Sequence, residues 1–523
     1  MNQQQPWRGQ PQYGPPPQYQ QYHRFPPPPR KRGNRGLIVL VVAVTLLAAA
    51  AGGYFLFFAG GGGGSGGGTA ADQDYDATVR EHGAAEVAWR VAQGGAADQA
   101  VANGAWLTGE HLVRRLPGRV VAYDLSSGDE AWAFPLDDPP KDNCKSSREQ
   151  SGNRVALLRS VGEGQPRTKS RAGTPGGCGK LTVLDLGTGK EVFTADLAPD
   201  ADKKLPDTMA RPVLTADRVV VDTAPGRVFD LAGGAEVPVP PAFAGCTAPS
   251  LGLFGDVLLA DSTCPGNTED RDHKNDELRT LRAYDANFAL KWEWKTPKDD
   301  KGEPLPVRGV LSVDPLVVEV GHSGHETRLL AVDPASGAAK PFAAYKTDTR
   351  GEFKYACAGQ GLRDCPAAKV VGGKVILSTS PVQVNPGDPD AGGAQATEFR
   401  NELVALDIAT GDAAWRTGKV AGRALAMVPT DDNRLIAFQP ENPNGAKAMV
   451  FSVNPADGKA TPVLAIGPAA LADDKLNKVL RNQSFGGGGE SDALWRDGLL
   501  IVIRTVYRPA TAVEISTVAF RGK

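Results

Sequence analysis

Two hydrophobic patterns divide this chain. Residues 37–58 (LIVLVVAVTLLAAAAGGYFLFF) form one uncharged apolar run of 22 residues. As a helix this run would extend about 33 Å, which matches a hydrocarbon core of about 30 Å. From residue 83 onward the apolar residues come instead in short, mostly alternating runs, which are typical of β-strands. The pattern predicts one transmembrane helix at 37–58, followed by a large all-β region at 83–523.

The β region repeats one motif, in which an apolar strand, an Asp, a short polar turn with Gly and a second strand follow one another. Its clearest copies are VVAYDLSSGDEAWAF (120–134), LTVLDLGTGKEVFTA (181–195) and LVALDIATGDAAWRT (403–417). The Asp accepts hydrogen bonds from amides two or three residues ahead, and the Gly supplies a positive φ. The aromatic residue four positions after the Gly is expected to pack between neighbouring sheets. The predicted turn residues are Asp124, Gly128, Asp185, Gly189, Asp407 and Gly411, and the aromatic residues are Trp132, Phe193 and Trp415.

The spacing of the turn residues predicts the number of repeats. Seven markers between Asp124 and Asn454 are separated by 55 residues on average, and residues 83–523 number 441. The ratio of 441 to 55 predicts a β-propeller of eight four-stranded antiparallel blades, with seven blades as the alternative. The segment AEVAWRVA (85–92) resembles the strand that follows a turn, with Trp89 as its aromatic residue. We therefore predict that this N-terminal strand completes the C-terminal blade and closes the ring.

The repeated motif, [LIVA]-[YLFV]-D-x-x-[ST]-G-x-x-x-[WF], resembles the repeat of pyrroloquinoline-quinone-type propellers. That family includes quinoprotein dehydrogenases and a non-enzymatic lipoprotein propeller that assists outer-membrane-protein assembly. The order of proline-rich tail, single helix and exported propeller is similar to that of membrane-anchored propellers in Gram-positive bacteria. The enzymatic members imply two adjacent cysteines under the quinone ring. Here the nearest pair, Cys357 and Cys365, is eight residues apart. We therefore expect no cofactor and no dehydrogenase activity.

The six cysteines fall into local pairs and are expected to form disulfides. An even count without any C-x-x-C pair suits an oxidising compartment better than a zinc site, although six cysteines formally allow fifteen connectivities. The expected pairs are Cys144 with Cys178, Cys246 with Cys264, and Cys357 with Cys365.

The segments around the apolar run set the topology. Residues 1–36 are rich in Pro and Gln and are predicted to be a disordered cytoplasmic tail. The basic cluster RKRGNRG precedes the run, so the positive-inside rule exports everything after it. Residues 59–82, which begin with a glycine tract, are predicted to be a flexible linker. A cleaved signal peptide is the alternative, but the run is longer than the core of such a peptide.

Charge and motifs limit the possible functions. Beyond residue 71 the chain has 52 basic and 60 acidic residues, and this acidic balance argues against a nucleic-acid partner. The pair His322 and His325 and the acid-rich loop 261–277 are candidate metal sites, but neither has a regular ligand spacing. The glycines of 486–490 lack the G-K-[ST] of a phosphate loop. The sequence therefore predicts no catalytic, cofactor-binding or metal-binding residues.

Three functions remain open. We favour a non-enzymatic binding or scaffold module, held at the cell membrane with a monomeric extracytoplasmic propeller. Insertions at 140–178, 261–277 and 381–400 would form its binding face for an envelope protein, a peptide or a glycan. A sensor that signals through the proline-rich tail is the second hypothesis, and a quinone-dependent dehydrogenase is the third.

Overall fold

A computed structural model gives the structure of the chain in many short segments. It describes residues 70–93, 100–101, 104–136, 144–160, 178–197, 211–221, 226–238, 250–264, 278–322, 326–346, 353, 356–357, 362–363, 365–383, 399–419, 424–430, 434–441, 447–481, 491–507 and 514–522. The predicted tail and the predicted membrane span at 37–58 lie outside these residues. Among the residues that are described, none belongs to a helix with the length and apolar character needed to cross a membrane.

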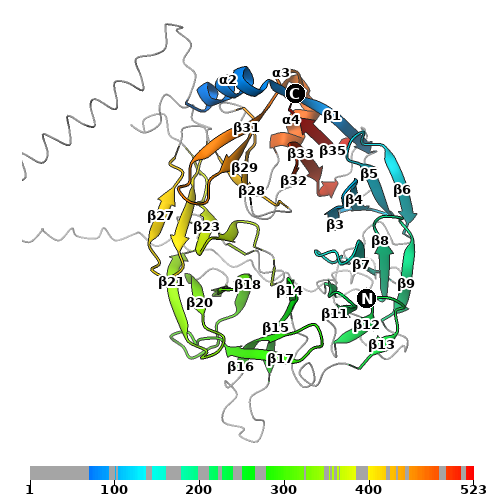
Figure 1. Cartoon of the computed structure of the whole chain (residues 1–523), viewed down its shortest axis with the longest axis vertical. Helices are drawn as coiled ribbons and strands as arrows, with labels where there is room; N and C mark the ends of the chain where they lie inside the picture. Colours follow the sequence, from blue (N-terminus) through cyan, green and yellow to red (C-terminus); the bar gives the residue numbers. More distant parts are fainter. Residues whose placement is uncertain are drawn as a thin grey trace, which may run out of the picture. The chain divides into compact units, whose positions relative to one another are not determined.

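Antiparallel sheets follow one another around a ring in chain order (Figure 1). We number them as blades. The first four blades contain β3 (Gly104–Leu107), β4 (His111–Leu116), β5 (Arg119–Asp124) and β6 (Glu130–Pro135); β7 (Arg154–Arg159), β8 (Lys180–Asp185) and β9 (Glu191–Asp196); β10 (Val213–Leu214), β11 (Arg218–Val221), β12 (Arg227–Asp230) and β13 (Glu236–Val237); and β14 (Ser250–Phe254), β15 (Val257–Cys264), β16 (Leu278–Tyr284) and β17 (Leu290–Lys295). In blade 2 an isolated bridge between Ser146 and Leu157 takes the innermost position.

The second half of the ring has the same construction. Blades 5 to 8 contain β18 (Val307–Val313), β19 (Leu316–Val320), β20 (Glu326–Val332) and β21 (Ala339–Lys346); β22 (Ala368–Val371), β23 (Lys374–Ser378), β26 (Leu403–Asp407) and β27 (Ala413–Arg416); β28 (Ala426–Val428), β29 (Leu435–Gln439), β30 (Met449–Val453) and β31 (Ala460–Ile466); and β32 (Ser491–Arg496), β33 (Leu499–Arg504), β35 (Glu514–Arg521) and β1 (Ala84–Gln93). The propeller prediction is confirmed, and the described residues supply eight blades.

Burial explains why the middle strands are apolar on both sides. In β4, β8 and β29 nearly every residue is buried, because each middle strand lies between the two neighbouring blades. The outermost strands β6 and β17 are mostly exposed instead, with inward-facing positions that are partly buried or, at Trp294, buried. The middle strands of each blade are therefore apolar on both sides, whereas the outermost strand has polar residues on its exposed side.

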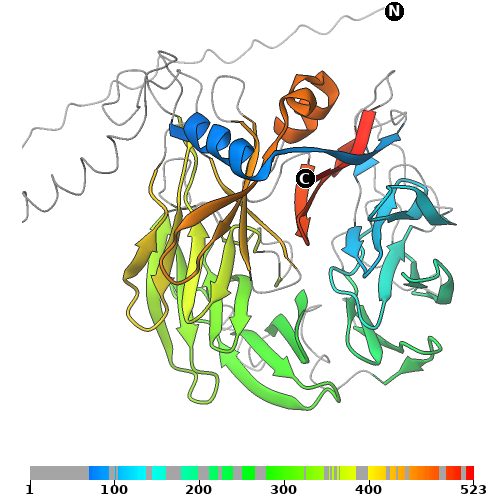
Figure 2. The ribbon, with the colours of Figure 1, turned by 45° about the horizontal axis from the view of Figure 1, so that its top comes forward.

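Strand β1 closes the ring. It pairs with β35 in antiparallel register, with Trp89 opposite Ala519, and so forms the outer strand of blade 8 (Figure 2). Its first two residues also pair in parallel with the end of β31, Ala84 opposite Ala465 and Ala85 opposite Ile466. This second pairing joins blades 7 and 8 into one eight-stranded sheet. The N-terminal strand thus links the first blade to the last two.

The aromatic residue of one blade packs on the turn glycine of the next. A Cβ atom added to Gly128 would lie 2.7 Å from the Cβ atom of Trp89, and one added to Gly189 would lie 2.5 Å from the indole of Trp132. Both glycines also have positive φ angles, 77° and 69°, which only glycine adopts freely. The same packing joins Phe193 to Gly234 and Trp415 to Gly458. The repeated glycine therefore makes room for the neighbouring blade as well as turning the chain.

The turn aspartates accept the hydrogen bonds that close each turn. The Asp124 carboxylate accepts from the amides of Ser126 and Ser127 at 2.8 and 3.0 Å, and from the Ser126 hydroxyl. The Ser126 hydroxyl contributes most to holding the pKa of Asp124 below its usual range. Bonds from the Ser336 hydroxyl and from the Thr410 amide lower the pKa values of Asp333 and Asp407 in the same way.

These lowered pKa values predict acid sensitivity. A carboxyl group with a lower pKa in the folded state stabilises the fold above its unfolded pKa of about 3.9, and this contribution is lost as pH falls through the folded pKa. We therefore expect the free energy of unfolding to decrease when the pH is lowered below about 4. The triple variant Asp124→Asn, Asp333→Asn, Asp407→Asn keeps an acceptor in each turn but cannot titrate there. Denaturant titrations between pH 3 and 7 should show a shallower decline for the variant, and identical declines would contradict this origin.

Two adjacent arginines in β4 hold the blades on either side of blade 1. The Arg114 guanidinium donates to Ser516 O at 2.8 Å, to Thr517 Oγ1 at 2.7 Å and to Arg504 O at 2.5 Å, all in blade 8. Arg115 points the opposite way and donates to Cys144 O and Ser146 Oγ in blade 2, each at 3.1 Å. Both side chains are almost fully buried. Successive residues of a strand face opposite sides, so one pair of arginines reaches both neighbours.

Helix α2 (Ala70–His82) changes the predicted extent of the linker. The linker was expected to run through residue 82, but the helix packs on β31, and the Tyr75 hydroxyl donates to Ile466 O at 2.7 Å. Tyr75, Thr78 and Val79 share the helix face that packs on the sheet, at i, i+3 and i+4 spacing. Basic residues in the last turn suit the helix dipole. Two short helices, α3 (Pro468–Ala472) and α4 (Asp474–Arg481), follow β31.

Candidate functional site

The two faces of the ring differ in their connections. The Asp turns, with Asn454 in place of the Asp in blade 7, join the third and fourth strands of blades 1 to 7, and we call the face that carries them the turn face. The second and third strands are joined on the opposite side, which we call the loop face. There the chain runs from Arg159 to Lys180 in blade 2, from Cys264 to Leu278 in blade 4 and from Ser378 to Leu403 in blade 6.

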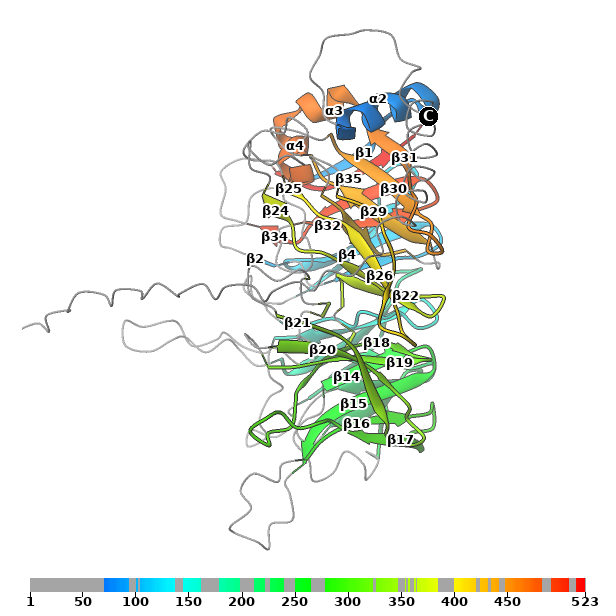
Figure 3. The ribbon, with the colours of Figure 1, turned by 90° about the vertical axis from the view of Figure 1, so that its left-hand side faces the viewer.

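The predicted insertions leave and re-enter the ring on the loop face. Most of their residues lie outside the described part of the chain, but their bracketing strand ends are described. Two short ladders also belong to this face: β24 (Val382–Gln383) with β25 (Phe399–Arg400), and β2 (Ala100–Val101) with β34 (Val506–Tyr507). Figure 3 shows both ladders on the same side of the blades. The loop face is therefore where the described chain departs from the regular blades.

The ladder of β24 and β25 has a rigid base. Asn401, which follows β25, is fully buried, and its side-chain amide donates to Thr379 O at 3.3 Å and to Leu425 O at 2.9 Å. Its Oδ1 accepts from the Leu425 amide at 2.6 Å. The next residue, Glu402, pairs with Arg416 at 2.8 Å. These bonds fix the point at which the ladder leaves blade 6.

Val382 of β24 is an exposed apolar residue on this rigid base. Its exposed fraction is 52%, and in the described part of the chain only Leu290, at 53%, is another exposed large hydrophobic residue. Leu290 begins β17, directly after a turn of the opposite face. The two residues are thus alike in exposure and apolar character but lie on different faces of the ring.

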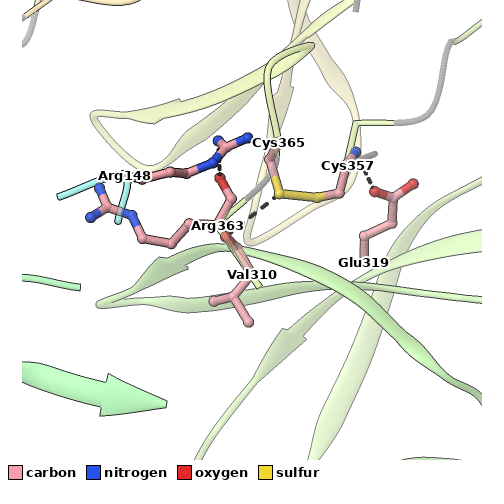
Figure 4. Close-up of a disulfide and its surroundings, with 6 residues drawn as sticks. All are labelled: Arg148, Val310, Glu319, Cys357, Arg363 and Cys365. Atoms are coloured by element: carbon pink, nitrogen blue, oxygen red, sulfur yellow. Dashed lines mark hydrogen bonds between the residues drawn. A yellow bond between two sulfur atoms is a disulfide. The ribbon is translucent and has the colours of Figure 1, made fainter. Parts of the chain in front are cut away.

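A disulfide-closed segment crosses the inner strands of several blades. Cys357 and Cys365 are bonded, as predicted, and the segment between them lies between blades 5 and 6 in sequence. A Cβ atom added to Gly309 of β18 would lie 2.5 Å from Cys357 Sγ and 2.7 Å from Cys365 Sγ. The Val310 amide donates to Leu362 O at 2.7 Å, and Leu362 is buried. The disulfide therefore rests directly on the innermost strand of blade 5 (Figure 4).

Arg363 extends the same segment to blades 2 and 4. Its guanidinium pairs with the Glu149 carboxylate at 3.1 Å and lies 5.2 Å from the ring centre of Phe254 in β14. The Arg148 guanidinium donates back to Arg363 O at 3.3 Å. Because residues 144–149 and β14 are the innermost parts of their blades, these contacts meet near the ring axis. We call Cys357, Leu362, Arg363 and Cys365 the axial segment.

A buried carboxylate anchors the other end of the axial segment. Glu319 of β19 is fully buried, and its Oε2 accepts from the Cys357 amide at 2.6 Å (Figure 4). Glu319 therefore holds the axial segment at Cys357, and Glu149 holds it at Arg363.

The axial segment does not fit the quinone arrangement of the enzymatic propellers. That arrangement needs two neighbouring cysteines under the ring, whereas here the bonded cysteines are separated by 8 positions and lie against Gly309. Leu362 and Arg363 fill the space beside them with a buried apolar contact and an ion pair. No reaction step through a quinone follows from these residues.

The sequence pairs His322 with His325 as a candidate metal site, but the structure groups His322 with two carboxylates instead. His322 meets Asp299 and Glu303, with ligand atoms within 4.8 Å of one another, and His325 lies outside the described residues. The contact between His322 Nε2 and Asp299 Oδ2, at 3.6 Å, is an ion pair when the histidine is protonated. Amides of the Asp299 turn, that of Glu303 most of all, lower the Asp299 pKa. In the acid-rich loop, Asp261 accepts a hydrogen bond from Arg279, whose Nε lies 3.0 Å from Asp261 Oδ1.

The structure places the other predicted site residues as follows. Cys144 and Cys178 are bonded, as expected, whereas Cys246 lies outside the described residues and its bond to Cys264 stays a prediction. The turn residues and aromatic residues lie at the blade boundaries, away from the axial segment. Arg363, Glu149 and Glu319 were missed, because no local motif marks them. The adjacent arginines of HLVRRL (111–116) were a signal that was overlooked, since a charged pair inside an apolar strand requires buried partners.

The blades, the Asp–Gly turns and the stacked aromatic residues together define a pyrroloquinoline-quinone-like β-propeller. Within this class the chain belongs to the outer membrane protein assembly factor BamB family, whose sequence model matches residues 118–482. None of the curated proteins matches the sequence significantly.

Solved structures with a similar fold come from both branches of the class. BamB from Moraxella catarrhalis is 14% identical, with 82% of this chain and 100% of that chain covered and a TM-score of 0.39. Quinohemoprotein alcohol dehydrogenase from Comamonas testosteroni is also 14% identical, with 86% and 78% covered and a TM-score of 0.43. A europium-containing methanol dehydrogenase is 11% identical, with 84% and 93% covered and a TM-score of 0.42.

Proposed function

We propose that this chain is a membrane-anchored propeller whose loop face binds a protein partner in the cell envelope. Membership in the BamB family supports a protein-binding scaffold, because the family is described by an assembly factor. The observation that carries the choice of face is that the long connections and the two short ladders lie on the loop face, with the exposed side chain of Val382 on one ladder. An exposed apolar side chain at such a place offers a partner a contact that binding would bury.

The location follows from two features. The apolar run at 37–58 provides a membrane anchor, and the basic cluster before it keeps the N-terminus in the cytoplasm. The two disulfides of the described residues support an oxidising compartment for the propeller. The proposal assigns no catalytic role, because the resemblance calls for two adjacent cysteines and the nearest pair here, Cys357 and Cys365, is 8 positions apart. The crosslinking experiment distinguishes a protein partner from a peptide or glycan ligand.

Substitution of Val382 tests the proposed face. A photo-crosslinking residue at 382 in the full-length protein, irradiated in intact cells, should give a protease-sensitive adduct, whereas the same residue at 290 should not. The substitution Val382→Asp should weaken partner binding about tenfold, because a charge replaces a buried apolar contact worth about 1.5 kcal/mol. Leu290→Asp, which is matched in exposure, should leave binding unchanged.

The outcomes separate the alternatives. An adduct cleaved by wall-degrading enzymes but not by protease indicates a glycan. An adduct that an external protease cannot reach after wall removal contradicts the extracytoplasmic location. Equal adducts or equal binding losses at positions 382 and 290 would contradict the loop face as the binding surface.

A further inference from the structure

We propose that the Cys357–Cys365 disulfide is a thiol–disulfide exchange site, which a dithiol reductant outside the cytoplasm opens by attack on Cys365. Opening it would release the axial segment from blades 2 and 4. This inference does not depend on which partner the loop face binds. It rests on the unequal exposure of the described disulfides and on the contacts that one of them maintains.

The two disulfides differ in access. Cys144 and Cys178 are both fully buried, within the core cluster that contains Leu158 and Leu181. Cys357 is also fully buried, but Cys365 is only partly buried, and the adjoining Arg363 side chain is 41% exposed. A thiolate must reach one sulfur to begin exchange, so access decides which disulfide reacts. Cys365 is the one residue of these four that is not fully buried.

The direction of the exchange follows from the same asymmetry. One thiolate of the reductant bonds to Cys365 Sγ, and the sulfur–sulfur bond breaks with its electron pair left on Cys357 Sγ, which takes up a proton. The second thiol of the reductant then attacks the mixed disulfide. This step releases Cys365 as a thiol and closes a disulfide in the reductant. Two electrons pass from the dithiol to the cystine, and no other reactant is required.

The disulfide keeps the axial segment in place. Leu362 and Arg363 lie inside the loop that the bond closes, and their contacts reach Val310, Glu149 and Phe254. Without the bond, the longer chain between Phe353 and Ala367 would have to be ordered by these contacts alone, at a greater cost in chain entropy. Reduction therefore loosens the contacts of the axial segment with blades 2, 4 and 5.

A reductive titration of the full-length protein tests the order of opening. The protein is exposed to low concentrations of dithiothreitol, alkylated at intervals and digested, and labelling is measured by mass spectrometry. Cys357 and Cys365 should be labelled at least tenfold sooner than Cys144 and Cys178. Simultaneous labelling, or earlier labelling of Cys144 and Cys178, would overturn the proposal.

Hydrogen exchange then tests the structural consequence. The Val310 amide, which donates to Leu362 O, should exchange at least tenfold faster after selective reduction. The Leu158 amide, which donates to Lys145 O at 2.9 Å beside the buried disulfide, is the internal control and should not change. An unchanged Val310 amide in the reduced protein would show that the bond does not hold the axial segment.

Two variants distinguish the effect of losing the Cys357–Cys365 disulfide from the effect of losing the Arg363–Glu149 ion pair. The double variant Cys357→Ser, Cys365→Ser should show fast Val310 exchange without any reductant. Arg363→Met keeps the disulfide but removes the ion pair with Glu149, and should retain the early labelling of Cys357 and Cys365. If the double variant fails to fold, the titration of the natural sequence still decides the question.

Discussion

The substitution Trp89→Ala should lower the free energy of unfolding by about 3–5 kcal/mol, because it removes a buried aromatic side chain from the closure of the ring. Trp89 is 5% exposed and packs on Gly128 of blade 1. Its indole N–H donates to Leu125 O at 2.9 Å. The substitution therefore leaves a cavity and an unsatisfied carbonyl group at the one boundary where the two ends of the chain meet. Equilibrium denaturation in urea would measure the loss.

Arg90 provides the matched control for this measurement. It is the next residue of β1, but its side chain is exposed and pairs with Asp473 at 3.3 Å on the surface. Exposed ion pairs contribute about 0–1 kcal/mol, so Arg90→Ala should have a small effect. If the two variants lost similar stability, or if Trp89→Ala lost less than about 1 kcal/mol, packing at the closure would not be what holds the ring.

The second large effect is expected from Arg114→Met. This substitution removes the three hydrogen bonds that the buried guanidinium donates to Ser516 O, Thr517 Oγ1 and Arg504 O, while the methionine keeps much of the apolar stem. The loss of a buried hydrogen bond to a charged group costs about 1.5–3 kcal/mol, but the variant no longer buries a charge, so the free energy of unfolding should fall by about 2–4 kcal/mol in total. The unfolding of blade 8, followed by hydrogen exchange of the β35 amides, should become easier.

Arg119 serves as the comparison for Arg114. It lies one strand away in β5 and pairs with Glu130 at 3.2 Å, with both side chains about half exposed. Arg119→Met should change stability by less than about 1 kcal/mol. Equal effects of the two substitutions would mean that Arg114 acts only through its charge, and that its bonds to blade 8 add little.

The parts of the fold that sequence reasoning recovered are those coded by neighbouring residues. The Asp, the Gly and the aromatic residue of each repeat lie within nine positions of one another, so the turn and the packing on the next blade follow from one short motif. Trp89 could be predicted as a blade aromatic because β1 has the pattern of the strand that follows the Asp–Gly turn in the other repeats, although no such turn precedes it. The bond between Cys357 and Cys365 followed from their closeness in sequence.

Other features depend on residues that meet only after folding. Arg363 and Glu149 are separated by 214 positions, and no periodicity relates them. The segment 70–82 is polar enough to resemble a continuation of the glycine linker, and it becomes a packed helix because Tyr75 finds Ile466, which is 391 positions away. The exposure of Val382 likewise depends on its pairing with Arg400 in the short ladder. It could not be predicted from the sequence, because nothing in the sequence marks a single valine as exposed.

The pairing of β1 has a consequence for biosynthesis. This strand is made first, but its partner β35 begins at Glu514, near the other end of the chain. At about 5–20 residues per second, the ribosome needs about 20–80 seconds to complete the intervening residues. During that interval residues 84–93 have no native antiparallel partner, and an unpaired apolar edge is prone to aggregation. A chaperone that shields this strand until translation ends would therefore raise the yield of closed rings more than one that acts on any later blade.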